Sequence, residues 1–468
     1  MKLIIASNRV CHAEKPQSGG LATAVQDTFS TIEGTWIGWS GQISETDERK
    51  SEKRGNIDYQ VFSLTEKEYR EYYLGFSNEV LWPVCHSRPD YVNFSAQAYQ
   101  TYCAVNAKFA EQVLSCAEDG DVVWVHDYHL LLAAQSLRAR GYQGVIGYFH
   151  HIPVPPAELL RTIPSHGELF GALLDYEVVG LQTRNDLKNL MDYFQSLRGQ
   201  HPELRVQAAG EEAFRLHWRG RSTQFGVYPI SVDTARIEEG AARAWALPPV
   251  QELKQSLGAR ALVIGVDRLD YSKGLERKFQ AFERHLGETA SAQLPVLLQI
   301  ASRSRSELAS YQQLCEGLEA QASRINGRHG TPSYAPLRYV NTVYAQSLLT
   351  GFYRLARAAL VTPVRDGMNL VAKEYVAAQD PDDAGVLILS EFAGAAQELG
   401  EALLVNPFDT AGVAQAIERA LHMPQLERVQ RHRAMLKRLR SHDIERWHQR
   451  FLFDLCACQP HLLERTGS

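Results

Sequence analysis

Residues 358–376, read as AALVTPVRDGMNLVAKEYV, place a short apolar run directly before a turn and a helical pattern. Residues 358–362 have the length and apolarity of a buried strand, and Pro363 and Gly367 interrupt the run. Asn369 is a residue type that commonly caps the start of a helix. The stretch therefore predicts a strand–turn–helix unit, the element from which helix-covered parallel sheets are built.

The same alternation of apolar runs and helical patterns extends along almost the whole chain. Strands are predicted at residues 3–6, 122–126, 145–150, 178–181, 225–230, 262–266, 296–300, 359–362 and 386–390. Helices are predicted at residues 96–116, 275–285, 306–320, 345–356 and 410–422. Continuous apolar strands of this kind indicate an α/β protein whose mainly parallel sheets are covered by helices on both faces.

The alternation falls into two sets, separated by a polar, helix-prone stretch at residues 231–259. We expect two Rossmann-like domains, residues 1–235 and 236–468. A basic helix at 429–440 and a more apolar helix at 447–456 close the chain. Ligands of doubly wound sheets bind beyond the carboxyl ends of the strands, so two such domains facing each other would form an interdomain cleft for two substrates.

Composition excludes several classes of protein. A chain of 468 residues favours more than one core, and a net charge of −5 argues against nucleic acid or an anionic membrane as the main partner. We find no apolar run near the ~18 residues of a membrane span. The seven cysteines show no framework spacing, which predicts reduced thiols in a cytoplasmic protein.

The turn before the predicted helix at Asn369 has the features of an anion site. A glycine turn that opens a helix leaves backbone N–H groups free at the positive end of the helix dipole. Glu374 follows within the helix, where its carboxylate could accept hydrogen bonds from sugar hydroxyls. An anion site beside a hydroxyl-binding carboxylate favours a nucleotide-sugar as ligand.

A second cationic turn follows the strand at 262–266. Arg268 and Lys273 flank a turn that leads into a helix, an arrangement suited to a diphosphate and to stabilising a leaving nucleotide. The alternative is a salt-bridged surface turn in which Asp267 and Asp270 are the partners of these cations. The position of the turn at the carboxyl end of a strand favours the binding function.

Polar residues also follow the strands of the first half. Arg9 ends the first strand, and the paired glycines at Gly20 permit close approach of a ligand to the backbone. Asp127 could hold a sugar hydroxyl or transfer a proton, and His151 follows the next strand. His126 and His129 lack a third ligand at a standard spacing, so no metal site is predicted.

Motifs spread over nearly the whole chain resemble, in the same order, those of trehalose-6-phosphate synthases. They are Ser7-Asn8-Arg9, Gly19-Gly20-Leu21-Ala22, Trp36-Ile37-Gly38-Trp39-Ser40-Gly41, Leu81-Trp82-Pro83, His126-Asp127-Tyr128-His129-Leu130, His151-Ile152-Pro153, Arg268-Leu269-Asp270-Tyr271-Ser272-Lys273-Gly274, Arg324-Ile325-Asn326-Gly327, Asp366 to Tyr375 and Ser390-Glu391-Phe392-Ala393-Gly394. The resemblance implies the GT-B architecture, two facing Rossmann-like domains. It also implies transfer of glucose from UDP-glucose to glucose 6-phosphate with retention of configuration and without a required metal or other cofactor.

The resemblance implies roles for individual residues. The acceptor would be bound by Arg9, Trp39, Tyr73, Trp82, Asp127 and Arg305, with the two arginines on its phosphate. The donor would be bound by Gly20, His151, Arg268, Lys273, Asp366, Gly367, Met368, Asn369, Leu370 and Glu374. Catalysis would depend on Asp127, His151, Arg268 and Lys273, and the leaving phosphate rather than a protein group would take the proton of the acceptor.

Two other functions remain open. Ser302-Arg303 and His86-Ser87-Arg88-Pro89 depart from the usual family pattern near the acceptor side, which leaves a glucosylglycerol-phosphate synthase, or a transferase with another phosphorylated acceptor, as the alternative. A non-catalytic sugar-phosphate sensor on the same fold is the third possibility. The resemblance further implies a homo-oligomer (dimer or tetramer), a separate trehalose-6-phosphate phosphatase, and a last helix at about 441–458 that crosses back to the first domain.

Overall fold

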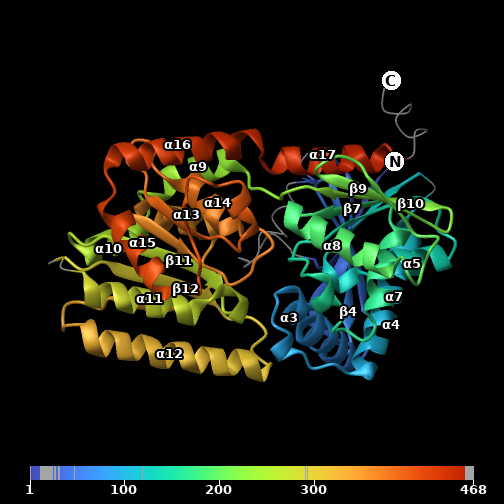
Figure 1. The fold of residues 1–468 in the computed structure, drawn as a ribbon, viewed down its shortest axis with the longest axis horizontal. Helices are drawn as coiled ribbons and strands as arrows, with labels where there is room; N and C mark the ends of the chain where they lie inside the picture. The colour runs from blue at the N-terminus through green and yellow to red at the C-terminus, as the bar shows by residue number, and fades with distance from the viewer. Residues whose placement is uncertain are drawn as a thin grey trace. The chain divides into compact units, whose positions relative to one another are not determined.

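The computed structural model describes residues 2–10, 25, 28–29, 32–46, 48–118, 120–289, 291 and 293–458. The described residues form two compact units (Figure 1). Unit 1 contains the described residues up to Pro229 together with those from Glu445 onward, and unit 2 contains Ile230–Ile444. Each unit has its own sheet and its own helices, so each has its own buried core.

Unit 1 is built on a ten-stranded sheet with the order β3-β4-β2-β1-β5-β6-β7-β10-β9-β8. The strands are β1 (Leu3–Arg9), β2 (Gly34–Ile43), β3 (Arg49–Arg54), β4 (Ile57–Leu64), β5 (Val122–His126), β6 (Val145–Phe149), β7 (Val178–Leu181), β8 (Arg205–Ala208), β9 (Ala213–Trp218) and β10 (Arg221–Val227). The strands from β4 to β10 pair in parallel, and antiparallel hairpins complete both edges. Every residue of β5 and β6 is buried, as a helix-covered parallel strand requires.

Helical segments cover this sheet. They are α2 (Glu66–Glu68), η1 (Tyr69–Leu81), α3 (Trp82–Cys85), η2 (Pro89–Tyr91), α4 (Ala96–Cys116), η3 (Tyr128–Leu130), α5 (Ala133–Ala139), α6 (Ala157–Leu160), α7 (His166–Gly171), η4 (Ala172–Asp175), α8 (Arg184–Leu197) and α17 (Ile444–Cys456). The segment η1 is a π-helix, a conformation that is rare and often marks functional sites. The register pairs Ser7 with His126 and His126 with Phe149, so β1, β5 and β6 end at one edge of the sheet.

Unit 2 contains a six-stranded sheet in which every pair of neighbours is parallel, with the order β13-β12-β11-β14-β15-β16. The strands are β11 (Leu262–Arg268), β12 (Val296–Ser302), β13 (Leu337–Val340), β14 (Ala358–Val361), β15 (Val386–Ser390) and β16 (Leu403–Val405). The helical segments are α9 (Thr234–Ala244), α10 (Pro248–Leu257), η5 (Tyr271–Lys273), α11 (Leu275–Glu288), α12 (Ala309–His329), α13 (Gln346–Leu355), α14 (Leu370–Ala378), η6 (Gly394–Gln397), α15 (Thr410–His422) and α16 (Gln425–Ser441).

The predicted α/β fold class is confirmed, and every strand predicted from the sequence is present. Six predicted strands differ in their bounds. In the structure β1 continues to Arg9, β6 ends at Phe149 before the histidine pair, β10 begins and ends earlier than expected, β11 continues to Arg268, β12 continues to Ser302, and β14 begins and ends one residue earlier. The sequence analysis did not predict β2, β3, β4, β8, β9, β13 and β16.

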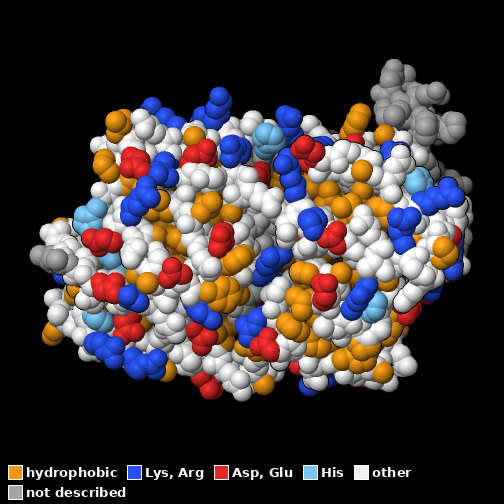
Figure 2. Space-filling view, in the orientation of Figure 1, with side chains coloured by type: hydrophobic (Ala, Val, Ile, Leu, Met, Phe, Trp, Pro, Cys, Tyr) orange, Lys and Arg blue, Asp and Glu red, His pale blue; other side chains and the backbone are white. Residues whose placement is uncertain are grey.

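The surface of the described residues carries interspersed charges. On the face drawn in Figure 2, Lys and Arg side chains alternate with Asp and Glu. Mixed charge of this kind gives no single-signed field on that face to attract a polyanion. Within the described residues, no helix combines the length and the apolar character that crossing a membrane requires.

The helix α17 packs on the parallel strands of unit 1. Phe451 is fully buried and stacks on Trp124 with ring centroids 4.6 Å apart. Glycines on the strands allow this approach, since a Cβ at Gly147 would lie 2.7 Å from Leu455 and one at Gly180 would lie 2.8 Å from Phe451. Residues from Glu445 onward therefore supply part of the core of unit 1.

The fold predicts a large difference between two phenylalanines of this helix. Phe451→Ala should lower the free energy of unfolding by about 3–5 kcal/mol, because it leaves a cavity against Trp124. Phe453, which is 66% exposed, is the matched control, and Phe453→Ala should change stability by less than about 0.5 kcal/mol. Urea unfolding measures both, and equal losses would contradict the packing described for α17.

Candidate active site

Asp127 follows β5 in a backbone conformation that few side chains adopt. Its φ of 74° lies in the left-handed region, which is uncommon for a residue other than glycine. The Asp127 N–H donates to the Phe149 carbonyl (2.8 Å), and the Asp127 Oδ1 accepts from the His151 N–H (3.1 Å). These two bonds hold the carboxylate at the carboxyl ends of β5 and β6.

Buried polar side chains of α4 support the loop that follows Asp127. The Tyr102 hydroxyl donates to the Tyr128 carbonyl (2.7 Å) and accepts from the Leu131 N–H (3.1 Å). The Asn106 amide donates to the His129 carbonyl (3.0 Å), and its oxygen accepts from the Leu132 N–H. A buried network with these bonds in place makes the loop rigid.

Three of the predicted acceptor residues of unit 1 lie together. The Arg9 guanidinium carbon is 5.5 Å from the centre of the Trp39 ring, and Trp39 packs on Tyr73 with centroids 5.6 Å apart. Tyr73 in turn stacks on His129 with ring planes 11° apart. The arrangement joins a cation to aromatic faces, which suits a phosphorylated sugar.

Trp82, the fourth predicted acceptor residue of unit 1, is almost fully buried (3% exposed). The centroid of its ring lies 4.0 Å from the ring centroid of His86 and 5.7 Å from that of Tyr128. Tyr128 also contacts His129, so Trp82 connects through packing to the loop after β5. The structure therefore gives this tryptophan little exposed surface.

His151 forms a hydrogen bond with a second histidine. Its Nε2 lies 3.0 Å from the Nδ1 of His126. Burial lowers the pKa of His126 to about 3 and lowers the pKa of His151 well below its usual value, which the neighbouring His126 reinforces. Both imidazoles are therefore neutral near pH 7. The sequence analysis considered His126 only as a metal ligand. The signal for this pair was a histidine at the end of β5 and another two residues beyond the neighbouring strand β6.

In unit 2, Lys273 and Asp366 form an ion pair that joins two loops. The Lys273 Nζ lies 2.5 Å from the Asp366 Oδ2, which also accepts from the Asn369 amide (2.9 Å). Asn369 has a φ of 76°, and its side-chain oxygen accepts from the Ala372 N–H (3.3 Å). The prediction that Asn369 caps this helix is confirmed.

The segment Gly367, Met368, Asn369 and Leu370 leads into the N-terminus of α14. The residues after β15 hold it in place: the Asp366 carbonyl accepts from the Gly394 N–H (3.2 Å), and the Met368 carbonyl accepts from the Ala395 N–H (2.8 Å). The backbone at the start of α14 is thus anchored on the side of the neighbouring strand, which fixes the N–H groups predicted to meet an anion.

The acidic residues beside Arg268 already hold cations from elsewhere. Asp267 forms a buried ion pair with Lys278 (2.6 Å), and Asp270 forms one with Arg305 (2.7 Å). Arg268 ends β11 and is half-buried. The alternative to a binding function was a surface turn in which Asp267 and Asp270 pair with the two cations. Lys273 pairs with Asp366 instead, so the structure does not support that alternative for Lys273.

Arg305, the predicted phosphate ligand of unit 2, is bound by two side chains. Besides Asp270, its guanidinium donates to the Tyr311 hydroxyl (2.6 Å), and Tyr311 donates to Asp270 (2.8 Å). The Arg305 side chain is 4% exposed, and its backbone has a φ of 48°. The hydrogen bonds among Arg305, Asp270 and Tyr311 fix the position of this arginine.

Glu374 has an unusual protonation equilibrium. Its carboxylate accepts from the Gln346 amide (3.1 Å) and from the Tyr353 hydroxyl (3.3 Å). Burial raises its pKa to about 7, although these two hydrogen bonds act in the opposite direction. A half-buried carboxyl that can both donate and accept is suited to a pair of sugar hydroxyls.

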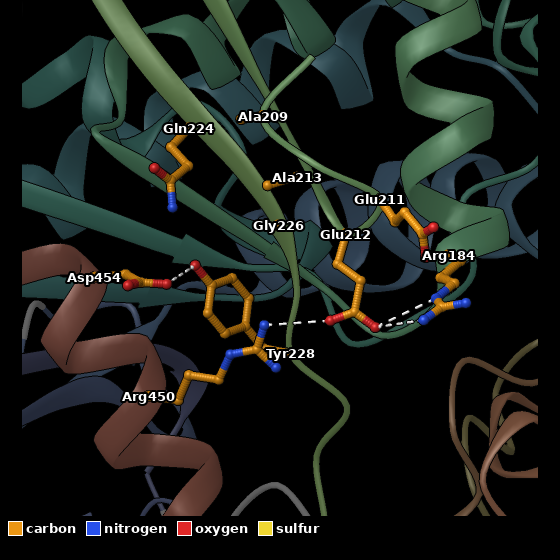
Figure 3. Close-up of a pocket in the computed structure, with 10 residues that line it drawn as sticks. All are labelled: Arg184, Ala209, Glu211, Glu212, Ala213, Gln224, Gly226, Tyr228, Arg450 and Asp454. Carbon is orange, nitrogen blue, oxygen red and sulfur yellow. Dashed lines mark hydrogen bonds and ion pairs between the residues drawn. The ribbon is translucent and has the colours of Figure 1, made fainter.

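Gly20 lies outside the described residues. Among the residues that the structure describes, no three His, Cys, Asp or Glu side chains are grouped as a metal site would need. A pocket of about 510 Å³ in unit 1 contains none of the predicted site residues. Figure 3 shows it where α17 meets β9 and β10, with Tyr228 bound to Asp454 and with Glu212 between Arg184 and Arg450.

Two α/β units with mainly parallel sheets, each with polar side chains at the carboxyl ends of its strands, are the architecture of GT-B glycosyltransferases. The sequence profile described as Glycosyltransferase family 20 matches residues 3–457. The chain belongs to glycosyltransferase family 20.

Proteins similar to this chain are described as trehalose-phosphate synthases. The chain is 42% identical to a trehalose-6-phosphate synthase of Enterobacter sp. (strain 638), over 99% of this chain and 97% of the relative. It is 43% identical to an α,α-trehalose-phosphate synthase (UDP-forming) of Burkholderia xenovorans solved with glucose-6-phosphate, with a TM-score of 0.93 and coverage of 97% and 100%. A solved E. coli structure described as bound with UDP-2-fluoro glucose is 41% identical and has a TM-score of 0.90. The match covers 97% of this chain and 99% of the E. coli chain.

The raised pKa of Glu374 predicts a pH-dependent stability. The folded carboxyl has a pKa of about 7 and the unfolded one about 4.5, so between these values the folded state binds the additional proton. The free energy of unfolding should therefore fall as the pH rises from 4.5 to 7. Glu374→Gln should remove this part of the decline, measured by urea unfolding at several pH values. Glu288→Gln, at an exposed ion pair, should follow the wild type, and identical profiles for all three proteins would contradict the prediction.

Proposed function

We propose that this protein is a retaining glucosyltransferase that transfers glucose from UDP-glucose to glucose 6-phosphate and forms α,α-trehalose 6-phosphate and UDP. The observation that carries the proposal is the full-length match to family 20, in which relatives named trehalose-6-phosphate synthase share more than 40% of their residues with this chain. Solved relatives are described with glucose-6-phosphate and with a fluorinated UDP-glucose.

In this proposal unit 2 binds the donor. Arg268 and Lys273 neutralise the diphosphate, and the backbone from Gly367 through Met368 and Asn369 to Leu370 meets sugar and phosphate oxygens. Asp366 accepts from glucose hydroxyls, and Glu374 accepts from those of the ribose. The Lys273–Asp366 ion pair supports this assignment, because it puts the cation and the carboxylate next to the helix N-terminus at Asn369. His151 and Gly20 complete the donor site.

Most of the proposed acceptor ligands belong to unit 1, and Arg305 belongs to unit 2. Arg9 and Arg305 hold the phosphate of glucose 6-phosphate, Trp39, Tyr73 and Trp82 line the sugar pocket, and Asp127 binds an acceptor hydroxyl. The support is the contact of Arg9 with Trp39 and of Trp39 with Tyr73, which joins a cation to aromatic faces. The fixed Asp127 carboxylate supports a role in orientation, which by itself contributes substantially to rate.

The proposed reaction exchanges two bonds on the same face of the glucose ring. The bond from the anomeric carbon to the diphosphate oxygen breaks, the bond to the acceptor hydroxyl oxygen forms, and the hydroxyl proton passes to the departing oxygen. Arg268 and Lys273 stabilise the charge that develops on the diphosphate. The neutral imidazole of His151 fits this scheme, since it supplies a hydrogen bond and no proton.

We further propose that the product leaves for a separate trehalose-6-phosphate phosphatase, and that the enzyme works as a homo-oligomer (dimer or tetramer) in the cytoplasm. The cysteines of the described residues support a reducing compartment, because all of them are free thiols. A glucosylglycerol-phosphate synthase remains the alternative, because Ser302-Arg303 departs from the family pattern next to Arg305.

The acceptor test separates these functions. With UDP-glucose, the purified protein should release UDP when glucose 6-phosphate is added, and mass spectrometry should detect a non-reducing disaccharide phosphate. Release with glycerol 3-phosphate alone would replace the proposed acceptor and keep the donor. No release with either acceptor, while UDP-glucose still binds in calorimetry, would favour the sensor.

Loss of one donor-site cation should reduce turnover strongly. Lys273→Ala and Arg268→Ala should each lower kcat/KM by about 10²–10³-fold, because each removes a charge that stabilises the leaving diphosphate. Arg284→Ala is the matched control, since Arg284 is exposed on α11 and, among the residues that the structure describes, forms an ion pair with Glu288 alone. Steady-state UDP release measures all three variants, and near-normal rates for the first two would refute the diphosphate assignment.

A further inference from the structure

One contact in unit 1 without an assigned role joins His126 to the proposed donor ligand His151. His126 ends β5 and is fully buried, while His151 lies two residues beyond β6 and is half-buried. Their rings are 5.3 Å apart at an angle of 25°, and the His126 Nδ1 lies 3.0 Å from the His151 Nε2. One of the two nitrogens must donate to the other.

Each neutral imidazole carries one N–H, so the bond has two possible directions. If His151 donates from Nε2, the proton of His126 lies on its own Nε2. That atom is buried, and no described residue forms a hydrogen bond with it. If His126 donates from Nδ1 instead, its Nε2 carries no hydrogen and the proton of His151 lies on Nδ1.

The second direction avoids an unpaired buried N–H. Buried N–H groups without an acceptor are rarer in proteins than under-used acceptor atoms, because the donor loses its only bond. The surroundings of His126 are aromatic, with the Trp124 ring centroid at 4.6 Å and that of Phe149 at 6.4 Å. The Nε2 atom therefore fits this environment better as a bare nitrogen.

We propose that His126 is a positioning residue: its Nδ1–H donates to His151 Nε2 and fixes His151 as the tautomer with its proton on Nδ1. His151 then presents an uncharged N–H donor to a hydroxyl of the donor sugar. This inference rests on the proposed function, in which His151 contacts that sugar. A neutral donor suits a hydroxyl oxygen, whereas the diphosphate is met by Arg268 and Lys273.

The rest of the environment fixes the orientation of His151. Its backbone N–H donates to Asp127, and its ring packs on Phe149 at 4.6 Å and on Trp447 of α17 at 6.2 Å. Packing restrains the plane of the ring, and His126 determines which nitrogen carries the proton. The two contributions together pre-organise one donor in the site.

Nitrogen NMR on the whole protein tests the tautomer directly. Protein labelled with ¹⁵N at histidine is compared with His126→Asn and His151→Asn to assign the two rings. We expect the His151 Nε2 to have the chemical shift of an unprotonated nitrogen and its Nδ1 that of a protonated one. The reverse pattern would overturn the proposal, and this readout does not depend on which acceptor the enzyme uses.

Steady-state kinetics tests the consequence. His126→Leu removes the donor and should lower kcat/KM for UDP-glucose about 10–100-fold, with the KM for glucose 6-phosphate within about threefold of wild type. His126→Asn places an amide near the Nδ1 position and should restore most of the loss. Equal losses in both variants, in proteins with wild-type melting temperatures, would overturn the proposal.

His150 is the matched control. It is also buried, but its Nδ1 bonds the Tyr148 hydroxyl (2.9 Å) and no proposed ligand. His150→Asn should keep kcat/KM within about threefold of wild type, and a loss as large as that of His126→Leu would show a general packing effect and refute the specific role. If the wild type itself releases no UDP with glucose 6-phosphate, the proposed function fails while the NMR result still decides the tautomer.

Discussion

The hydrogen bond from the Asp127 N–H to the Phe149 carbonyl is the constraint on which the polar groups at the ends of β5 and β6 depend. It continues the pairing of β5 with β6 by one residue and holds Asp127 in a left-handed conformation that the residue would not adopt alone. The Asp127 carboxylate can then accept a hydrogen bond from the His151 N–H, and the ring of His126 can form a hydrogen bond with the ring of His151. The geometry of several polar groups therefore follows from the pairing of two strands.

Unit 2 also has left-handed backbone, at Arg305 and Asn369, and adds buried ion pairs to it. Lys278 with Asp267, Lys373 with Glu398 and Arg305 with Asp270 are buried ion pairs around the elements that carry the proposed donor ligands. Pairs of this kind add little net stability, but removal of one partner leaves an uncompensated buried charge. They restrict the arrangement of η5 and α14, because any other arrangement would separate them.

Sequence reasoning succeeded where one physical signal dominated. Continuous apolar runs located the central strands, and Asn369 located a helix start. It failed at β3, whose six residues RKSEKR are all exposed and which forms only because β4 offers an edge. It could not predict the pairs Lys273–Asp366 and Arg305–Asp270 either, because their partners are 93 and 35 residues apart and meet only in the folded sheet. The π-helix at Tyr69–Leu81 has no local signature that we recognised.

The place of α17 in the core of unit 1 has a consequence for synthesis of the chain. The strands β5, β6 and β7 leave the ribosome long before Trp447 and Phe451, since all of unit 2 is translated between them. Until α17 arrives, the glycine-lined surface at Gly147 and Gly180 and the ring of Trp124 stay uncovered. Unit 2 can complete its fold first, although its sequence comes later, and the nascent unit 1 exposes an apolar surface of the kind that chaperones bind.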